Sequence, residues 1–114
     1  MSKAKVSVVM AVYNGQEYLN IAIDSILQQT YKNLELIIID DGSTDNSKHV
    51  VKNYDDKRIR YIYQANQGLA AALNHGIKAA TGSYIARMDC DDISYPTRIS
   101  EQVDYLENKK SVMM

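Results

Sequence analysis

Residues 34–45 carry the sequence LELIIIDDGSTD, and this stretch decides the fold class of the chain. Residues 34–39 form a nearly continuous apolar run, which is typical of a strand buried on both faces of a parallel sheet. Aspartate and glycine then end the strand. Ser43 or Thr44 is expected to cap a helix that carries Asp45 in its first turn, where a negative charge is favourable.

The same alternation of strand and helix extends along the whole chain. Strands are expected at residues 5–10, 34–39, 59–63 and 83–88, and helices after Gly15, after Thr44, at 69–80 and near Pro96. Helices between successive strands force crossover connections, so the pattern predicts an α/β fold whose mostly parallel sheet has helices on both faces. We expect the first helix to bury one face made of Tyr18, Ile21, Ala22, Ser25, Ile26 and Gln29, broadened by Leu19, Ile23 and Leu27.

Composition and charge exclude several classes of protein. The 114 residues are 46% hydrophobic and 24% charged, which is ordinary for a globular protein and excludes a disordered charged tail. A net charge of −1 gives no reason to expect nucleic acid as a partner. One cysteine excludes an internal disulfide framework, and no apolar run approaches the roughly 20 residues of a membrane span. The start of the chain has no signal-peptide pattern, so we expect a cytoplasmic protein.

Two acidic clusters directly follow predicted strands. They are Asp40-Asp41-Gly42-Ser43 after the second strand and Asp89-Cys90-Asp91-Asp92 after the fourth. Open parallel sheets bind ligands at the carboxyl ends of their strands, so both clusters are expected to border one cleft. Crowded carboxylates repel one another unless a cation or hydrogen-bond donors lie between them, and their hard oxygens suit Mg²⁺ or Mn²⁺. The alternative is that the clusters only end strands and cap helices, which fits the first cluster better than the second.

Other kinds of site find no support in the sequence. No G-x-G-x-x-G follows the first strand, and the chain has neither a P-loop nor an EF-hand pattern after Asp40. His49 and His75 have no metal-ligating partner nearby in the sequence, so we expect them to be surface or packing residues. Cys90 lies between carboxylates that raise the pKa of a thiol, so a catalytic cysteine is not expected.

Five segments of the chain together resemble the glycosyltransferases of family 2. They are VSVVMAVYNG at residues 6–15, ILQQTY at 26–31, LELIIIDDGSTD at 34–45, NQGLAAALN at 66–74, and DCD at 89–91 followed by ISYPTR. The segments occur in the family's order and cover nearly the whole chain. The resemblance implies a GT-A fold whose first half is a Rossmann-like sheet that binds a nucleotide-sugar. It also implies a role in polysaccharide biosynthesis.

The resemblance also implies roles for single residues. Asp41 is expected to accept a hydrogen bond from the base, an imide N–H of uracil, and Asp91 to ligate Mn²⁺ or Mg²⁺ on the diphosphate. Asp89 is expected near the ribose or sugar and beside the metal. Leu73 stands where family members often carry a basic residue, so no phosphate contact is expected there. The remaining nucleotide-sugar-binding residues are expected to be Ala11, Val12, Tyr13 and Glu17 at the base and ribose, with Asn66, Gly68 and Asn74 as further donor contacts.

The resemblance further implies that residues 1–114 are the donor-binding part of a longer protein. Family members continue with another strand near residues 109–114, and the acceptor half, with the general base of an inverting transfer, lies beyond. The expected reaction moves a hexose or amino sugar from a UDP-sugar to a hydroxyl acceptor such as a saccharide. Asp92 and Glu101 are the first candidates for the base if these residues alone catalyse transfer.

Two other interpretations remain open at this point. In the first, the chain is a non-catalytic module that binds a nucleotide and a metal. In the second, it is a doubly wound domain whose acidic strand ends are only turns and caps. Peripheral membrane association of the longer enzyme is also left open. An uncovered sheet edge and a low net charge predict self-association through residues 94–106.

Overall fold

The fold is built on one parallel sheet of four strands. The computed structural model describes residues 4–108. Its strands are β1 (Val6–Val12), β2 (Leu34–Asp41), β3 (Ile59–Gln64) and β4 (Tyr84–Asp89), and their order across the sheet is β3-β2-β1-β4. All three neighbouring pairs are parallel, so the predicted α/β class with a parallel sheet is confirmed. The family strand expected near residues 109–114 lies outside the described residues.

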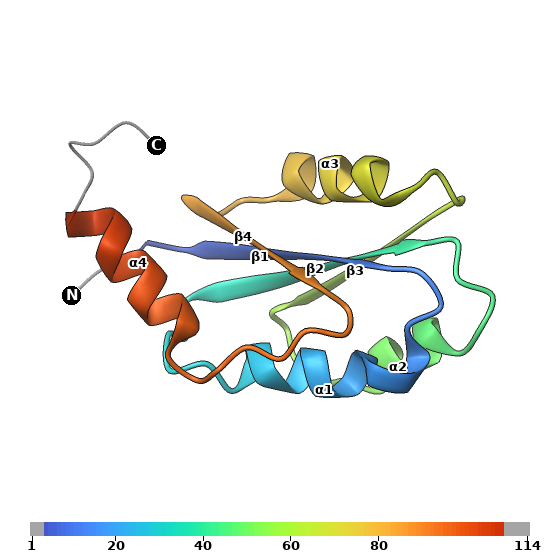
Figure 1. The fold of residues 1–114 in the computed structure, drawn as a ribbon, viewed down its shortest axis with the longest axis horizontal. Coiled ribbons are helices and arrows are strands. Elements are labelled where there is room, and N and C mark those ends of the chain that lie inside the picture. The colour runs from blue at the N-terminus through green and yellow to red at the C-terminus, as the bar shows by residue number, and fades with distance from the viewer. Residues whose placement is uncertain (1–3, 109–114) are drawn as a thin grey trace.

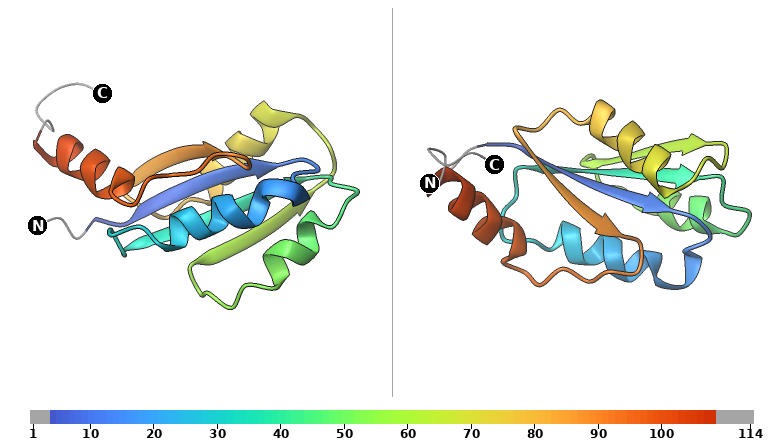
Figure 2. Two further views of the ribbon diagram at one scale, coloured as in Figure 1. Left: turned by 60° about the horizontal axis from the view of Figure 1, so that its bottom comes forward. Right: turned by 45° about the horizontal axis from the view of Figure 1, so that its top comes forward.

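Helices cover both faces of this sheet, as predicted. They are α1 (Gln16–Leu27), α2 (Ser47–Lys52), α3 (Leu69–Ala79) and α4 (Arg98–Asn108). Figure 1 shows α3 above the sheet and α1 and α2 below it, and Figure 2 shows α1 and α2 side by side on that lower face. None of the helices in residues 4–108 has the length and apolar character needed to cross a membrane.

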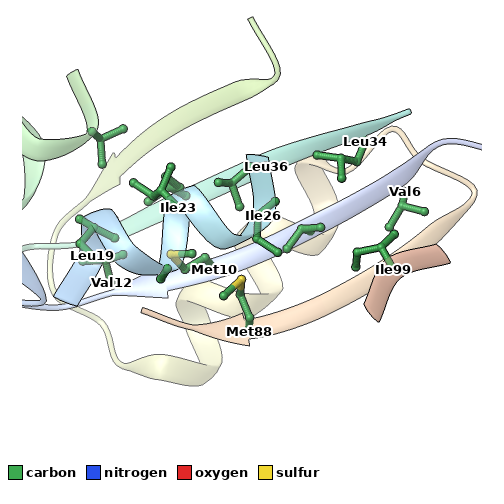
Figure 3. Packing of buried hydrophobic residues seen from close by; sticks show 14 of the residues in the cluster. Val6, Met10, Val12, Leu19, Ile23, Ile26, Leu34, Leu36, Met88 and Ile99 are labelled. Atoms are coloured by element: carbon green, nitrogen blue, oxygen red, sulfur yellow. The ribbon is translucent and has the colours of Figure 1, made fainter. Parts of the chain in front are cut away.

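The alternation of side chains along the strands creates one core on each face. On the side of α1, the larger cluster joins both ends of β1 to Ile23 and Ile26, and α4 adds Ile99 and Val103 (Figure 3). On the other side, Val9 and its neighbours pack against α3. Because β1 and β2 are the central strands, every residue in them is buried, which explains their continuous apolar sequences.

The predicted apolar face of α1 is wrong: the face that is buried in the structure is rotated about the helix axis by about one residue from the predicted one. The buried residues are Leu19, Ala22, Ile23 and Ile26, whereas Tyr18 and Ile21 are 52% and 45% exposed. Apolar side chains cover more than half of the helix circumference, so periodicity alone did not fix which part faces the sheet. The sheet lies against the part with branched aliphatic side chains, and the tyrosine, which has a polar hydroxyl, stays in contact with solvent.

Gln29, just beyond α1, is fully buried and holds the segment that follows β4. Its amide nitrogen donates to the carbonyls of Tyr95 (2.8 Å) and Ser25 (3.0 Å), and its carbonyl accepts the N–H of Ile99 (3.0 Å). The Thr30 N–H donates to the next carbonyl in that segment, at 3.0 Å. These bonds fix the chain between β4 and α4 and so determine where the acidic cluster after β4 lies.

A second buried polar group, Glu35, lies near the amino ends of the strands. Its side chain accepts hydrogen bonds from the Ser7 hydroxyl (2.6 Å), from the N–H and hydroxyl of Thr81 (2.8 and 3.0 Å) and from Arg60 (3.0 Å). Lys5 adds an ion pair at 3.7 Å. Arg60 also donates to the carbonyl of Ala79 at the end of α3, so this carboxylate ties three strands to that helix.

Candidate functional site

The candidate site lies at the carboxyl ends of the strands, where both acidic clusters were expected. The loops after β1, β2 and β3 leave the sheet on the right of Figure 1. Ala11 in β1 pairs in register with Ile39 in β2 and with Asp89 in β4. Side chains alternate along a strand, so Asp41, Ala11 and Asp89 all face the side of the sheet that carries α3. The site therefore has a defined face, which the sequence did not specify.

Three carboxylates meet in the turn after β4. Ligand oxygens of Asp89, Asp91 and Asp92 all lie within 4.8 Å of one another, and the three residues are exposed. One oxygen of Asp92 accepts the N–H of Asp89 at 2.9 Å, so this side chain closes the turn. Negative charges at such spacing repel in the absence of a cation. Carboxylate oxygens in small number, open to solvent, fit Mg²⁺ or Mn²⁺, which keep water and substrate oxygens as their other ligands.

Cys90 points away from this carboxylate cluster and packs against the loop after β1. A Cβ atom placed on Gly15 would lie 2.7 Å from the sulfur of Cys90, so only glycine fits there without movement. Burial raises the pKa of the Cys90 thiol, and the negative charge of Asp91 raises it further. The thiol is therefore held in its protonated form, as the sequence predicted, which does not suit a nucleophile.

Asp41 is buried beneath the loop between β3 and α3. One carboxylate oxygen accepts the Gln64 side-chain amide and the Gln67 N–H, both at 2.8 Å. The other oxygen accepts the Gly68 N–H at 3.0 Å and has a long contact of 3.4 Å with the Asn66 amide. Burial by itself would raise the pKa of Asp41, but these hydrogen bonds outweigh it and lower the pKa below its ordinary value. Asp41 is therefore an anion at neutral pH, and it orders the loop that carries Asn66 and Gly68.

The neighbouring carboxylate, Asp40, has a different environment. It lies on the α1 side of the sheet, where it accepts the N–H of Ser43 at 2.9 Å and the hydroxyl of Tyr61 at 2.5 Å. Burial of Tyr61, together with its bond to this carboxylate, raises the pKa of the phenol. Asp40 therefore has the structural role that was left open for the first acidic cluster: it ends the strand and holds the turn. Asp41 instead faces the candidate site.

The other expected site residues differ in how they meet solvent. Tyr13 is 54% exposed and Glu17 is exposed, so both side chains are accessible at this edge. Val12 and Ala11 are buried in opposite cores, so only their main chain can meet a ligand at the strand end. Asn74 lies farther along α3, in a groove of about 340 Å³ between that helix and Arg87 of β4.

The predicted cap of α2 is wrong. The helix begins at Ser47, and neither Ser43 nor Thr44 caps it. The hydroxyl of Ser43 instead accepts the N–H of Asn14 at 2.9 Å, and the N–H of Thr44 donates to the side-chain oxygen of Asn14 at 2.8 Å. Contacts between the two loops compete with capping, so the helix starts two to three residues later than the local sequence suggests.

Sequence reasoning did not assign roles to three residues that shape this site. Asn14 links two of the loops, Gln64 binds Asp41, and Arg87 places a positive charge on the α3 side two residues before Asp89. The position of Arg87 could have been predicted, because side chains alternate between the two faces of a strand. Residues two apart in β4, such as Arg87 and Asp89, therefore share one face. For Asn14, the signal was an asparagine two residues after the end of β1, because asparagine is one of the few residues that adopt a left-handed backbone readily.

Comparison with known structures identifies the architecture as that of GT-A glycosyltransferases. TarS of S. aureus in complex with UDP-GlcNAc superposes with a TM-score of 0.88 at 23% identity, over 93% of this chain and 32% of that one. A mannosyltransferase of Pyrobaculum calidifontis, in complex with GDP-Man and Mn²⁺, superposes with a TM-score of 0.84 at 26% identity, over 93% and 33%. The expected GT-A fold is therefore confirmed.

The sequence comparisons identify the family itself. The chain belongs to glycosyl transferase family 2, whose model matches residues 7–114. An uncharacterized glycosyltransferase of Rickettsia conorii is 47% identical over 95% of this chain, and one of Haemophilus influenzae is 41% identical over 99%. The chain spans 18% and 46% of the lengths of these two relatives, respectively.

Proposed function

We propose that this chain is the donor-binding part of an inverting, metal-dependent glycosyltransferase that uses a UDP-sugar. The observation that carries the proposal is the placement of Asp41 and the Asp89–Asp91 carboxylates on one face at the carboxyl edge of the sheet. A family 2 sequence and GT-A neighbours solved with UDP, UDP-GlcNAc and GDP-Man support it. In the longer protein, the sugar passes to a hydroxyl acceptor such as a saccharide.

The acidic turn is the proposed metal site. Asp91 and Asp89 hold Mn²⁺ or Mg²⁺, while Asp92 keeps its bond to the Asp89 N–H and fixes the turn. A cation bound there would supply positive charge to neutralise the diphosphate leaving group as its bond to the sugar breaks. Support for a divalent ion comes from the carboxylate oxygens themselves and from the neighbour that contains Mn²⁺.

Asp41 is the proposed acceptor for the uracil imide. The oxygen that bonds Gln64 and Gln67 already has two good donors, whereas the other has one good donor and the long Asn66 contact. That second oxygen therefore has a lone pair to offer, because the 3.4 Å contact with Asn66 is weak and the Asn66 amide makes its good bond, of 3.0 Å, to the main-chain carbonyl of Asp41. The lowered pKa of Asp41 keeps it an acceptor at neutral pH.

Replacing Asp41 with asparagine tests this assignment and the proposed function together. The side chain keeps its shape but offers a donor where the imide needs an acceptor, so UDP affinity is expected to fall about fivefold to a hundredfold. Affinity for inorganic pyrophosphate with Mn²⁺ is expected to stay unchanged. Isothermal titration calorimetry measures both, and GDP titrations report base selectivity. An equal loss for UDP and pyrophosphate would show that Asp41 serves the phosphate or metal region instead.

Self-association is a further expectation of the proposal. The edge strand β4 and α4 border a groove of about 520 Å³, and Ile85, Tyr95 and Tyr105 on its walls are 45–59% exposed. Two edge groups of β4 are already bonded, the Arg87 carbonyl to Arg98 and the Asp89 N–H to Asp92. The association is therefore expected to use the side chains of the groove rather than strand pairing.

Sedimentation across a concentration series tests this expectation. The chain is expected to form dimers or larger assemblies at hundreds of micromolar, and Tyr105→Lys to weaken them by placing charge in the groove. Tyr18→Lys, at a tyrosine of similar exposure on α1, is the control and is expected to behave as wild type. A monomer at every concentration would contradict the expectation.

A further inference from the structure

Asn14 has an unusual backbone conformation at the edge of the proposed site. Its φ angle is 52°, and among residues 4–108 it is the one non-glycine residue with positive φ. Left-handed backbone is unfavourable for most L-residues, and asparagine is one of the few that tolerate it. The side chain is exposed, so packing in the core does not explain this conformation.

The side chain of Asn14 bridges the loop after β1 to the loop after β2. Its carbonyl oxygen accepts the N–H groups of Thr44 (2.8 Å) and Asp45 (3.3 Å), with a longer contact to the Thr44 hydroxyl (3.4 Å). The main-chain N–H of Asn14 donates to the Ser43 hydroxyl at 2.9 Å. An oxygen at this position is therefore matched to two converging backbone donors of the second loop.

The next residues strengthen the same bridge in both directions. The N–H of Gln16 donates to the carboxylate of Asp45 at 3.2 Å, and the side chain of Gln16 accepts the N–H of Asn46 at 3.0 Å. Burial would raise the pKa of Asp45, but its bonds to Ser47 and Gln16 lower it, so the carboxylate stays ionised and accepts these donors at neutral pH. The two loops therefore act as one unit.

The two joined loops connect Tyr13 and Asp41, the residues expected on opposite sides of the proposed nucleoside site. Tyr13 directly precedes Asn14, and Asp41 directly precedes the loop that Asn14 holds. On the other side, Gly15 lies so close to Cys90 that a Cβ atom would be 2.7 Å from its sulfur. The turn between β1 and α1 is thus held on one side by hydrogen bonds and on the other by close packing.

We propose that Asn14 is a positioning residue. It sets the distance between Tyr13, on one side of the proposed nucleoside site, and Asp41, on the other side. The inference rests on the proposed function. Asn14 acts through the loop of residues 43–45 and makes no contact with the nucleotide. The bond pattern accounts for both properties of the residue: an oxygen acceptor aimed at two N–H groups, and a backbone that tolerates the left-handed region.

Two variants separate the backbone of Asn14 from its side chain. Asn14→Gly keeps the left-handed backbone but removes the acceptor, so UDP affinity with Mn²⁺ is expected to fall about tenfold. Asn14→Asp keeps the acceptor oxygen and is expected to bind UDP within about threefold of wild type. Both are expected to bind pyrophosphate with Mn²⁺ as wild type does, because the metal site is held by other contacts. Asn20→Ala, at an exposed asparagine of α1, is the matched control.

Hydrogen exchange of the Thr44 and Asp45 amides, measured without ligand, shows whether the bridge is lost in each variant. Faster exchange at both amides in Asn14→Gly together with unchanged UDP affinity would overturn the inference. An Asn14→Asp variant as weak as Asn14→Gly, or an equal loss of pyrophosphate affinity, would also overturn it. A wild-type chain that binds no UDP would instead defeat the proposed function, even if the amide exchange rates change as expected.

Discussion

Asp91→Asn is expected to lower the affinity for UDP in the presence of Mn²⁺ at least tenfold, or about 1.4 kcal/mol. The substitution keeps the shape of the side chain but removes a negative charge next to a divalent ion, whose attraction to a carboxylate is the main source of binding. Calorimetric titration of UDP into the Mn²⁺-loaded chain measures the effect. Without a divalent cation, wild type and variant are expected to bind UDP equally weakly.

Asp92→Asn is the matched control for this change. The asparagine oxygen can still accept the N–H of Asp89, so the turn keeps its shape while the cluster loses the same unit of charge. A smaller loss than for Asp91→Asn is expected. If Asp91→Asn binds as wild type while Asp92→Asn does not, the assignment of the metal ligand is wrong.

Glu35→Ala is expected to lower the free energy of unfolding by about 3–5 kcal/mol. Glu35 is only 4% exposed. The change removes the acceptor that the Ser7 hydroxyl, the Thr81 N–H and the Arg60 guanidinium share. Denaturant unfolding measures the effect. Asp104→Ala, at an exposed carboxylate of α4, is the control and is expected to change the unfolding free energy by less than about 0.5 kcal/mol.

The pH dependence of stability gives an independent check of the same group. Burial alone would raise the pKa of Glu35, but hydrogen bonds from Ser7, Thr81 and Arg60 lower it from 4.5 to about 2. A lowered folded-state pKa stabilises the fold above pH 4.5, and that contribution, about 3 kcal/mol, is lost as the pH falls toward 2. Glu35→Gln is expected to lack this part of the pH dependence. An unchanged slope in that variant would contradict the role assigned to the carboxylate.

The fold could be predicted from the sequence because the two central strands carry an unambiguous pattern. The runs at residues 6–12 and 34–39 are apolar except for Ser7 and Glu35, and such runs are typical of a strand covered by helices on both sides. In α4 the buried residues are Ile99 and Val103, which lie four positions apart, the spacing of one helix face. The apolar face of α1 could not be predicted to within one residue, because apolar side chains surround most of that helix.

The position of the two acidic clusters was also predictable, but the environment of each carboxylate was not. Both acidic clusters were expected at the carboxyl ends of strands. Adjacent carboxylates in a strand necessarily face opposite sides, yet the strand pattern does not state which side carries which helix. The pattern alone therefore could not distinguish Asp40 from Asp41, and it was the family resemblance that assigned the base to Asp41. The bridge made by Asn14 depends on contacts between residues about 30 positions apart, which local helix-capping rules do not include.

A calorimetric titration of UDP into the wild-type chain, with and without Mn²⁺, tests the central claim most directly. The claim is that the carboxyl edge of the sheet binds a nucleoside diphosphate together with a divalent cation held by Asp89 and Asp91. The predicted result is one saturable site whose affinity rises at least tenfold when Mn²⁺ is present, or about 1.4 kcal/mol. The absence of binding at millimolar UDP with Mn²⁺ would contradict the claim and would leave the acidic strand ends as turns and caps.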